Sequence, residues 1–295
     1  RSPSGWDKLE RSLSILREKE GVSFDDYSTL EIAPSYLLEC NSLGPNGIVE
    51  ALLGNVLELS AKDGVAGPRL WISFMDKLSY LQILLIADLP TTEKVALLLN
   101  LYHVMVLHGN LVFGPPLARS SWSHFFSSMS YIMSFDLLSA YELEHNVLRA
   151  ALCRPSPHTY LAQFPGLALY QRDFRLNFCI NNGSKSMPAV VPLYKANALD
   201  DQLDEATHRM LASSVKVDLN RRAVQLPLVC SWYLSDFASR HDSSALPADC
   251  LRVVVHYLTG DNKAALMQML TDGGNISVRF DKFIYRCSSF GMMGV

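Results

Sequence analysis

The chain has 295 residues, a formal net charge of −3 at pH 7 and a pI near 6.3. Proteins that hold nucleic acid through its phosphates need a strongly basic face, so this charge balance argues against a direct nucleic-acid patch. Hydrophobic residues make up 49% of the chain and charged residues 19%, so we expect a large core and apolar surface that can dock on a protein partner.

The cysteines lack the paired spacing of a metal finger or a small disulfide framework: Cys40, Cys153, Cys179, Cys230, Cys250 and Cys287. Scattered free thiols are typical of a reducing compartment, so we expect an intracellular, cytoplasmic protein. The chain begins at Arg1 rather than Met, which suggests a piece of a longer protein. Spanning a bilayer takes about 20 apolar residues, so the shorter apolar runs Leu81–Leu89 and Val95–Leu107 indicate core helices rather than membrane spans.

A helix capped by Ser4 is expected to end at Gly21, so that residues 1–21 form a helical appendage to one domain over residues 22–295. Helical periodicity predicts further helices in that domain, in chain order near Ile48–Leu59, Trp71–Leu89, Thr91–Gly109, Ser139–Leu152, Asp201–Ser213, Cys230–Ser239, Ala248–Leu258 and Lys263–Leu270. The helix that begins at Thr91 is apolar on every side and is predicted to be the buried central helix.

Alternation of side chains predicts a few short strands. Ser214–Leu219 and Ala223–Leu228 flank a polar turn and are expected to form a hairpin, while Ile276–Phe280 is a later strand. Phe174–Ile180 alternates cleanly, which would place four residues on one face: Arg175, Asn177, Cys179 and Asn181. Many helices with a small, mainly antiparallel sheet indicate a helix-rich α+β fold.

The segment Asp173–Pro188 reads DFRLNFCINNGSKSMP, and it resembles the motif D-P-R-I-H-F-A-L-N-C-G-S-x-S-C-P of the domain of unknown function 547 family. Aligned without gaps, this chain keeps the scaffold residues Asp173, Arg175, Asn181, Gly183, Ser184, Ser186 and Pro188. The family's histidine falls on Asn177, and its two cysteines fall on Asn182 and Met187. The resemblance therefore implies a vestigial site that has kept its scaffold and lost its nucleophile.

Three further segments resemble the same family in the same order. They keep Asn100, Tyr102 and His108 within Ala96–His108; Glu144, His145 and Arg149 within Ser139–Arg149; and Trp232, Tyr233, Asp236 and Phe237 within Ser231–Phe237. The resemblance implies a papain-like or transglutaminase-like core of cysteine peptidase ancestry.

Two features of the segment Asp173–Pro188 each allow two interpretations. Cys179 is either a relocated nucleophile, which needs a low pKa and a base such as His145, or a buried thiol that packs as a small apolar residue. The turn from Asn181 to Ser186 is either an anion-binding nest that serves as an oxyanion hole, or a connection in which Gly183 supplies a positive φ. We expect the structural interpretation in both cases.

Other polar positions are also expected to be mainly structural. Asn100 should hydrogen-bond a neighbouring loop, and Asp236 either orients a histidine or pairs locally. His108 lies near the expected end of its helix, where the helix dipole favours the charged imidazolium. No histidine pair or carboxylate cluster has the spacing of a metal site and no glycine-rich nucleotide loop is present, so we expect no metal and no cofactor.

These observations predict a catalytically inactive pseudo-hydrolase domain that acts as a protein-interaction or scaffolding module in a larger assembly. The predicted vestigial site is Asn177, Asn182, Met187, His145 and Glu144. The predicted binding residues are Asn100, Asn181, Gly183, Ser184, Ser186, Arg149 and Asp236. Two alternatives remain: an active cysteine hydrolase or transferase that uses Cys179, and a ligand-sensing domain that reuses the old cleft.

Overall fold

A computed structural model describes residues 34–61, 67–134, 136–152, 164, 166–238 and 246–287, with side chains from residue 42 onward. The predicted appendage over residues 1–21 lies outside these ranges, as does Cys153. The main helices are α2 (Pro34–Ala61), α3 (Pro68–Tyr80), α4 (Thr91–Phe113), α5 (Arg119–Ser128), α8 (Leu199–Ser214), α10 (Pro247–Val254) and α11 (Gly260–Asp272). Shorter helical pieces are η2 (Leu81–Ile83), α6 (Ala140–Glu142), η3 (Leu143–Leu148), α7 (Leu176–Cys179), η4 (Ala196–Ala198), α9 (Leu228–Trp232), η5 (Leu234–Phe237) and η6 (Val255–Tyr257).

The strands form two small sheets, and the fold is the expected helix-rich α+β class. β1 (Ser130–Met133) and β2 (Asp136–Ser139) make an antiparallel hairpin. β3 (Lys216–Asp218) and β4 (Ala223–Leu226) make the second hairpin, which confirms the hairpin prediction, and β5 (Ser277–Phe280) adds to β4 in parallel. The second sheet is therefore mixed rather than purely antiparallel.

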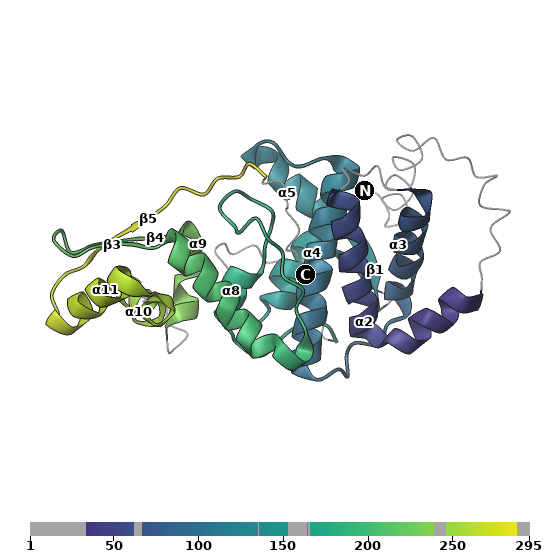
Figure 1. Ribbon diagram of the computed structural model, residues 1–295, viewed down its shortest axis with the longest axis horizontal. Coiled ribbons are helices and arrows are strands. Elements are labelled where there is room, and N and C mark those ends of the chain that lie inside the picture. Colours follow the sequence, from purple (N-terminus) through teal and green to yellow (C-terminus); the bar gives the residue numbers. More distant parts are fainter. Residues whose placement is uncertain are drawn as a thin grey trace.

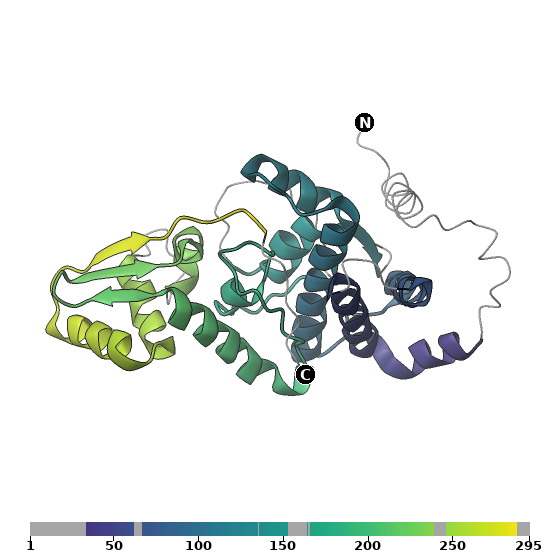
Figure 2. The ribbon, with the colours of Figure 1, turned by 45° about the horizontal axis from the view of Figure 1, so that its top comes forward.

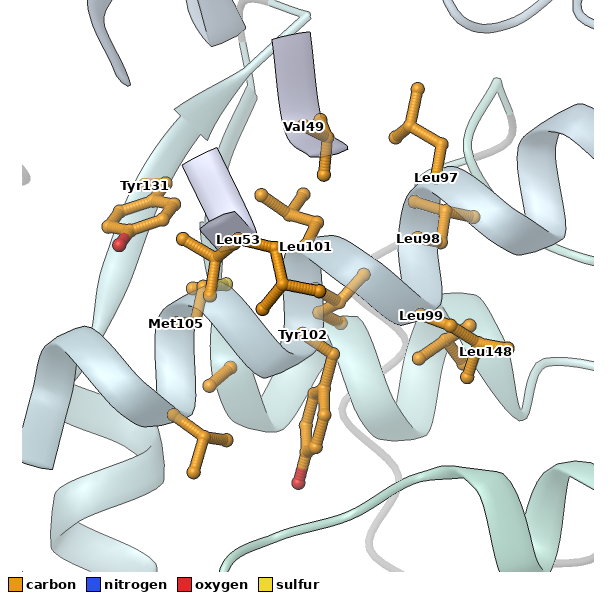
Figure 3. Packing of buried hydrophobic residues seen from close by; sticks show 14 of the residues in the cluster. Val49, Leu53, Leu97, Leu98, Leu99, Leu101, Tyr102, Met105, Tyr131 and Leu148 are labelled. Atoms are coloured by element: carbon orange, nitrogen blue, oxygen red, sulfur yellow. The ribbon is translucent and has the colours of Figure 1, made fainter. Parts of the chain in front are cut away.

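The larger core surrounds α4 and includes residues of α2, α3, α5, β1 and β2. Figure 3 shows Leu53 of α2 facing Leu101 and Met105 of α4, with Tyr131 of β1 beside them. α4 is long and apolar enough to cross a membrane, but 89% of that stretch is buried inside the protein, and no other helix in the described part of the chain meets the same criteria. We call this the first core.

A second core lies at the other end of the molecule, where α10 and α11 pack beside the β3–β4–β5 sheet (Figures 1 and 2). α8 connects the two cores, because Leu203 near its start belongs to the first and Met210 and Leu211 near its end belong to the second. The short helix α7 lies at the same boundary: Leu176 and Cys179 enter the first core and Phe178 the second. We call this boundary the seam.

The predicted strand Phe174–Ile180 is wrong, because the segment forms a helical turn. Successive amides donate three residues back, from Asn177 to the Phe174 carbonyl at 3.0 Å and from Phe178 to the Arg175 carbonyl at 2.9 Å. The Asp173 carboxylate starts the turn by accepting from the Arg175 amide at 2.9 Å. Both cores bury this turn, so its apolar residues face more than one direction and imitate the alternation of a half-buried strand.

The predicted helix Ser139–Leu152 begins as expected and then changes type. Ser139 Oγ accepts from the Glu142 amide at 3.2 Å, and a Glu142 carboxylate oxygen accepts from the Ser139 amide at 2.8 Å, so the two residues form a capping box. After Glu142 the chain winds as a π-helix through Leu148.

Candidate functional site

A buried chain of polar side chains crosses the seam at the position of the family motif. It runs in the order Tyr102, Glu144, Arg149, Asn177 and Asp236, and we call it the seam chain. Tyr102 Oη donates to Glu144 Oε2 at 2.7 Å, and Arg149 Nε donates to Glu144 Oε1 at 3.3 Å. Two predicted vestigial residues, Glu144 and Asn177, and two predicted binding residues, Arg149 and Asp236, are thereby brought together from segments far apart in the sequence.

The π-helix explains why Glu144 pairs with Arg149. Residues five apart do not face each other on an α-helix, so helical spacing does not predict this pair. In a π-helix the repeat is longer, and the Arg149 amide donates to the Glu144 carbonyl at 3.0 Å. The two side chains therefore stack on one face of the helix.

Asn177 occupies the centre of the seam chain. Arg149 Nη1 donates to its Oδ1, and its Nδ2 donates to Asp236 Oδ2 at 3.1 Å. The Arg149 guanidinium also lies over the Tyr233 ring, 3.7 Å from the ring centroid. The Asp236 carboxylate could orient a histidine if one stood at position 177. The side-chain amide of Asn177, however, cannot exchange protons near neutral pH.

Arg172 joins the far end of the seam chain and was missed by the sequence analysis. Its Nη2 lies 3.7 Å from Asp236 Oδ1 and donates to the Ser235 carbonyl at 3.1 Å. Nothing local in the sequence signals this pair, because the fold alone brings positions 172 and 236 together.

Two groups of the seam chain, Glu144 and Tyr102, have pKa values that are shifted away from neutral pH. Burial raises the pKa of the Glu144 carboxyl, but the charges of His145 and Arg149 and the hydrogen bonds from Tyr102 and Arg149 outweigh it, so the net pKa is lowered. Burial and the neighbouring Glu144 carboxylate raise the pKa of Tyr102 well above its usual value. Neither group is set up to exchange a proton near neutral pH.

Cys179 is buried in the first core. Its Sγ donates to the Leu203 carbonyl at 3.9 Å, and burial raises the pKa of the thiol to about 12. After burial, the groups that act on this pKa are Tyr194, Asp173, Arg175 and Asp204, and no histidine is among them. His145, the base considered in the sequence analysis, is half-buried with its ring centroid 4.5 Å from that of Tyr141.

Most amides of the turn after α7 already have acceptors within the protein. Asn181 Oδ1 accepts from the Gly183 amide at 2.9 Å, and Asn182 Oδ1 accepts from the Ser184 amide at 3.1 Å. The Met187 amide donates to the Ser184 carbonyl at 3.0 Å. Gly183 has a φ of 79°, as the structural interpretation of this turn requires. An oxyanion hole needs unoccupied donors, and these amides are not available for that role in this conformation.

Two asparagines brace the loops around this turn. Asn100 of α4 donates to the Tyr194 carbonyl at 2.8 Å and accepts from the Tyr194 amide at 2.9 Å, so its whole side-chain amide serves a neighbouring loop as expected. Asn181 Nδ2 donates to the Pro188 carbonyl at 2.7 Å, and its amide donates to His103 Nε2 at 3.2 Å.

The charged state expected for His108 is wrong. α4 continues to Phe113, so His108 lies inside the helix rather than near its end, and burial lowers its pKa to about 4. In the same helix burial lowers the pKa of His103 to about 4 as well. Both imidazoles are therefore neutral at physiological pH.

Residues 281–287, which we call the tail strap, cross the turn on their way back from β5 toward α5, as the yellow segment of Figure 2 shows. The Ile284 amide donates to Ser186 Oγ at 2.7 Å, the Lys185 amide donates to the Arg286 carbonyl at 2.8 Å, and Ser184 pairs with Cys287 in an isolated antiparallel bridge. Predicted binding residues Ser184 and Ser186 thus contact the tail strap.

A cleft of about 660 Å³ opens beside the tail strap, between the turn, the end of α8, the start of β3 and the chain after β4. Met187, one of the predicted vestigial residues, contributes to its wall. Among the described residues, no group of three or more His, Cys, Asp or Glu side chains could hold a metal ion.

Residues 86–211 match the model of a protein family described as "Protein of unknown function, DUF547". The matched range includes the family-like segments Ala96–His108, Ser139–Arg149 and Asp173–Pro188, and it ends before Ser231–Phe237. Neither a curated protein nor a solved structure matches the chain.

Proposed function

We propose that this chain, whose residues 86–211 match the DUF547 family model, is a catalytically inactive relative of that family that serves as a protein-interaction or scaffolding module. One observation carries this proposal. In the resemblance described above, the family's histidine and two cysteines fall on Asn177, Asn182 and Met187, and each of these side chains has a structural role in this fold.

Those tasks leave no reactive group at the three positions. Asn177 bridges Arg149 and Asp236, and Asn182 accepts from the Ser184 amide. Met187 is buried in the second core with 7% of its surface exposed. An amide is not a nucleophile and a thioether carries no acidic proton, so this arrangement supports binding rather than hydrolysis.

The proposal includes a papain-like or transglutaminase-like ancestry for the seam. Its support is the pair formed by Asn177 and Asp236, since hydrolases of this chemistry use a carboxylate to orient a histidine. A histidine at position 177 would meet Asp236 in that way. The active-hydrolase alternative rests on Cys179, the one thiol in the motif segment, but its burial and raised pKa oppose it.

The rate at which Cys179 reacts with a thiol reagent tests the proposal. With a pKa of about 12, Cys179 should carry so little thiolate at pH 8 that the native protein reacts more than about 1,000-fold slower than a model thiol of pKa ~8.5. Iodoacetamide labelling followed by mass spectrometry of each cysteine measures this rate, and the urea-unfolded chain gives the reference rate.

Half-buried Cys287 is the internal comparison, because burial raises its pKa only to about 11. We expect Cys287 to label before Cys179. Rapid labelling of Cys179 with an apparent pKa below ~8.5, or a peptide-hydrolysis rate that disappears in the Cys179→Ala variant, would overturn the proposed inactivity.

A further inference from the structure

We propose that the cleft beside the tail strap binds an acidic peptide segment of a partner protein, with Lys185, Lys216 and Lys282 receiving its carboxylates. This inference rests on the proposed function, because it names the partner chemistry of an interaction module. The cleft borders the old motif at Met187, so the site would reuse the neighbourhood of the lost nucleophile for binding.

The first argument is the charge of the cleft. Its three lysines come from the motif turn, the start of β3 and the tail strap, and all three are exposed. None forms an ion pair with a described residue, whereas Lys195 elsewhere pairs with Glu50 at 2.9 Å. Unpaired like charges that line one concavity focus a positive potential and favour an anionic ligand.

The one acidic side chain among the lining residues does not neutralise this charge. The Asp281 carboxylate accepts from the Gln225 side-chain amide, and its backbone amide donates to the Leu226 carbonyl at 2.9 Å. Asp281 is thereby tied to β4. The concentration of lysines is unusual for a chain whose formal net charge is −3.

The second argument is the apolar surface between the lysines. Met187, Met210 and Val229 are buried in the second core and line the cleft, and Phe283 of the tail strap lines it as well. Ile284 adds an apolar side chain at the cleft that is 51% exposed. Methionine side chains adapt to ligands of different shape, which suits a surface that receives side chains of a partner.

The combination favours a peptide over smaller anions. The cleft volume of about 660 Å³ lies within the range of ligand sites, about 300–1,000 Å³, and can admit a few side chains. The positive groups lie on three separate elements with apolar surface between them. A ligand that alternates carboxylates and apolar groups matches this arrangement. An acidic-hydrophobic peptide has this pattern, a fatty acid has a single carboxylate, and inorganic phosphate has no apolar part.

A binding titration with defined probes tests the inference on the full 295-residue chain. The probe is a fluorescein-labelled decapeptide that alternates glutamate and leucine. The comparison probes alternate lysine with leucine or glutamate with serine, and laurate serves as competitor. We expect saturable binding of the glutamate–leucine peptide that weakens with salt, with weaker binding of both comparison peptides.

The variant Lys185→Glu, Lys216→Glu and Lys282→Glu should weaken that binding by at least about 30-fold without changing Tm, since the three side chains are exposed. The matched control is Arg221→Glu, Arg252→Glu and Lys263→Glu, which changes the net charge equally at positions outside the cleft. We expect the control to change binding by less than about 3-fold.

Three results would overturn the inference: no saturable binding of the glutamate–leucine peptide, an equal loss in the control variant, or displacement of the peptide by micromolar laurate. The last result would assign the cleft to a fatty acid instead. Mass spectrometry of the peptide after incubation distinguishes a failure of the proposed catalytic inactivity from a failure of the proposed peptide binding. Cleavage of the bound peptide contradicts the proposed inactivity, whereas an intact peptide that fails to bind contradicts only this inference.

Discussion

Lowering the pH from 7 to 4 is expected to unfold this protein, because two neutral histidines are buried in the first core. His103 and His108 are both fully or almost fully buried on α4, and burial lowers the pKa of each to about 4. The unfolded chain would protonate the same groups near pH 6.5. Between these two pH values the unfolded state binds more protons than the folded state, so stability falls as the pH falls.

The expected size of this effect is large. At about 1.4 kcal/mol for each pKa unit, each histidine removes about 3 kcal/mol of folding free energy between pH 6.5 and pH 4. Both together remove about 6 kcal/mol, which is comparable to the whole stability of many domains, about 5–15 kcal/mol. Glu144 acts in the same direction, because its folded pKa is also lowered and its contribution is lost in acid.

The double variant His108→Phe and Tyr131→Phe isolates one of these groups. His108 Nδ1 lies 2.8 Å from Tyr131 Oη, and its ring packs near Trp71 and Phe74. Removing both members of the hydrogen bond leaves no unpaired polar atom from the pair, and a phenyl ring suits the aromatic surroundings. Urea unfolding at pH 7, 6, 5 and 4 should show a loss of stability about 3 kcal/mol smaller than in the unmodified protein.

The control for the pH experiment is His256→Gln, because His256 is exposed and lies in the second core's surface helix η6. This variant should keep the pH dependence of the unmodified protein. If the His108→Phe and Tyr131→Phe variant also keeps it, His108 is not the neutral buried group described here.

Helices with a strong pattern could be predicted from the sequence, and those shaped by tertiary contacts could not. α4 was predicted because its apolar residues surround the helix, and the β3–β4 hairpin because a polar turn separates two alternating runs. The β1–β2 hairpin was missed, since Ser123–Phe135 has no clear period. That hairpin depends on a distant contact, in which Ser134 Oγ donates to the Leu84 carbonyl at 2.6 Å.

The structure of the seam was also not predictable from local sequence patterns. Asn177 was expected on a strand because the residues around it alternate, but two cores on different sides of α7 produce the alternation. The π-helix brings Glu144 to Arg149. A search for apolar residues with the α-helical period of 3.6 residues does not detect this wider winding. The family resemblance nevertheless pointed to Glu144, Arg149 and Asp236 as kept residues and to Asn177 as a substituted one. A polar side chain inside the fold at each of these positions needs a partner.

The lysines of the cleft could not be found from the sequence at all. Lys185, Lys216 and Lys282 lie on three elements far apart in the chain, and each resembles an ordinary exposed lysine on its own. The tail strap brings Lys282 to the other two, and the sequence predicted no structure for residues 281–287 after the strand Ile276–Phe280. This lysine cluster forms only when the chain after β5 passes back over the turn, so it is a property of the fold and not of any local sequence.

Replacing Arg149 by methionine is expected to cost about 3–5 kcal/mol of folding free energy, the usual penalty for removing one partner of a buried ion pair. The Arg149 side chain is 3% exposed and contacts the Glu144 carboxylate, the Asn177 amide oxygen and the Tyr233 ring. Methionine keeps most of the apolar stem but leaves Glu144 buried without this cation. Urea unfolding at pH 7 measures the loss.

The matched control is Arg252→Met, which breaks an exposed pair with Asp249 at 2.8 Å and should change stability by less than about 1 kcal/mol. The variant Arg149→Met with Glu144→Gln separates charge from packing. Because glutamine removes the uncompensated carboxylate, this double variant should recover about 1–2 kcal/mol relative to Arg149→Met alone. No recovery would mean that the contact of Arg149 with Tyr233, and not the ion pair, holds the seam together. In either case a large loss at Arg149 would show that the seam chain stabilises the contact between the two cores.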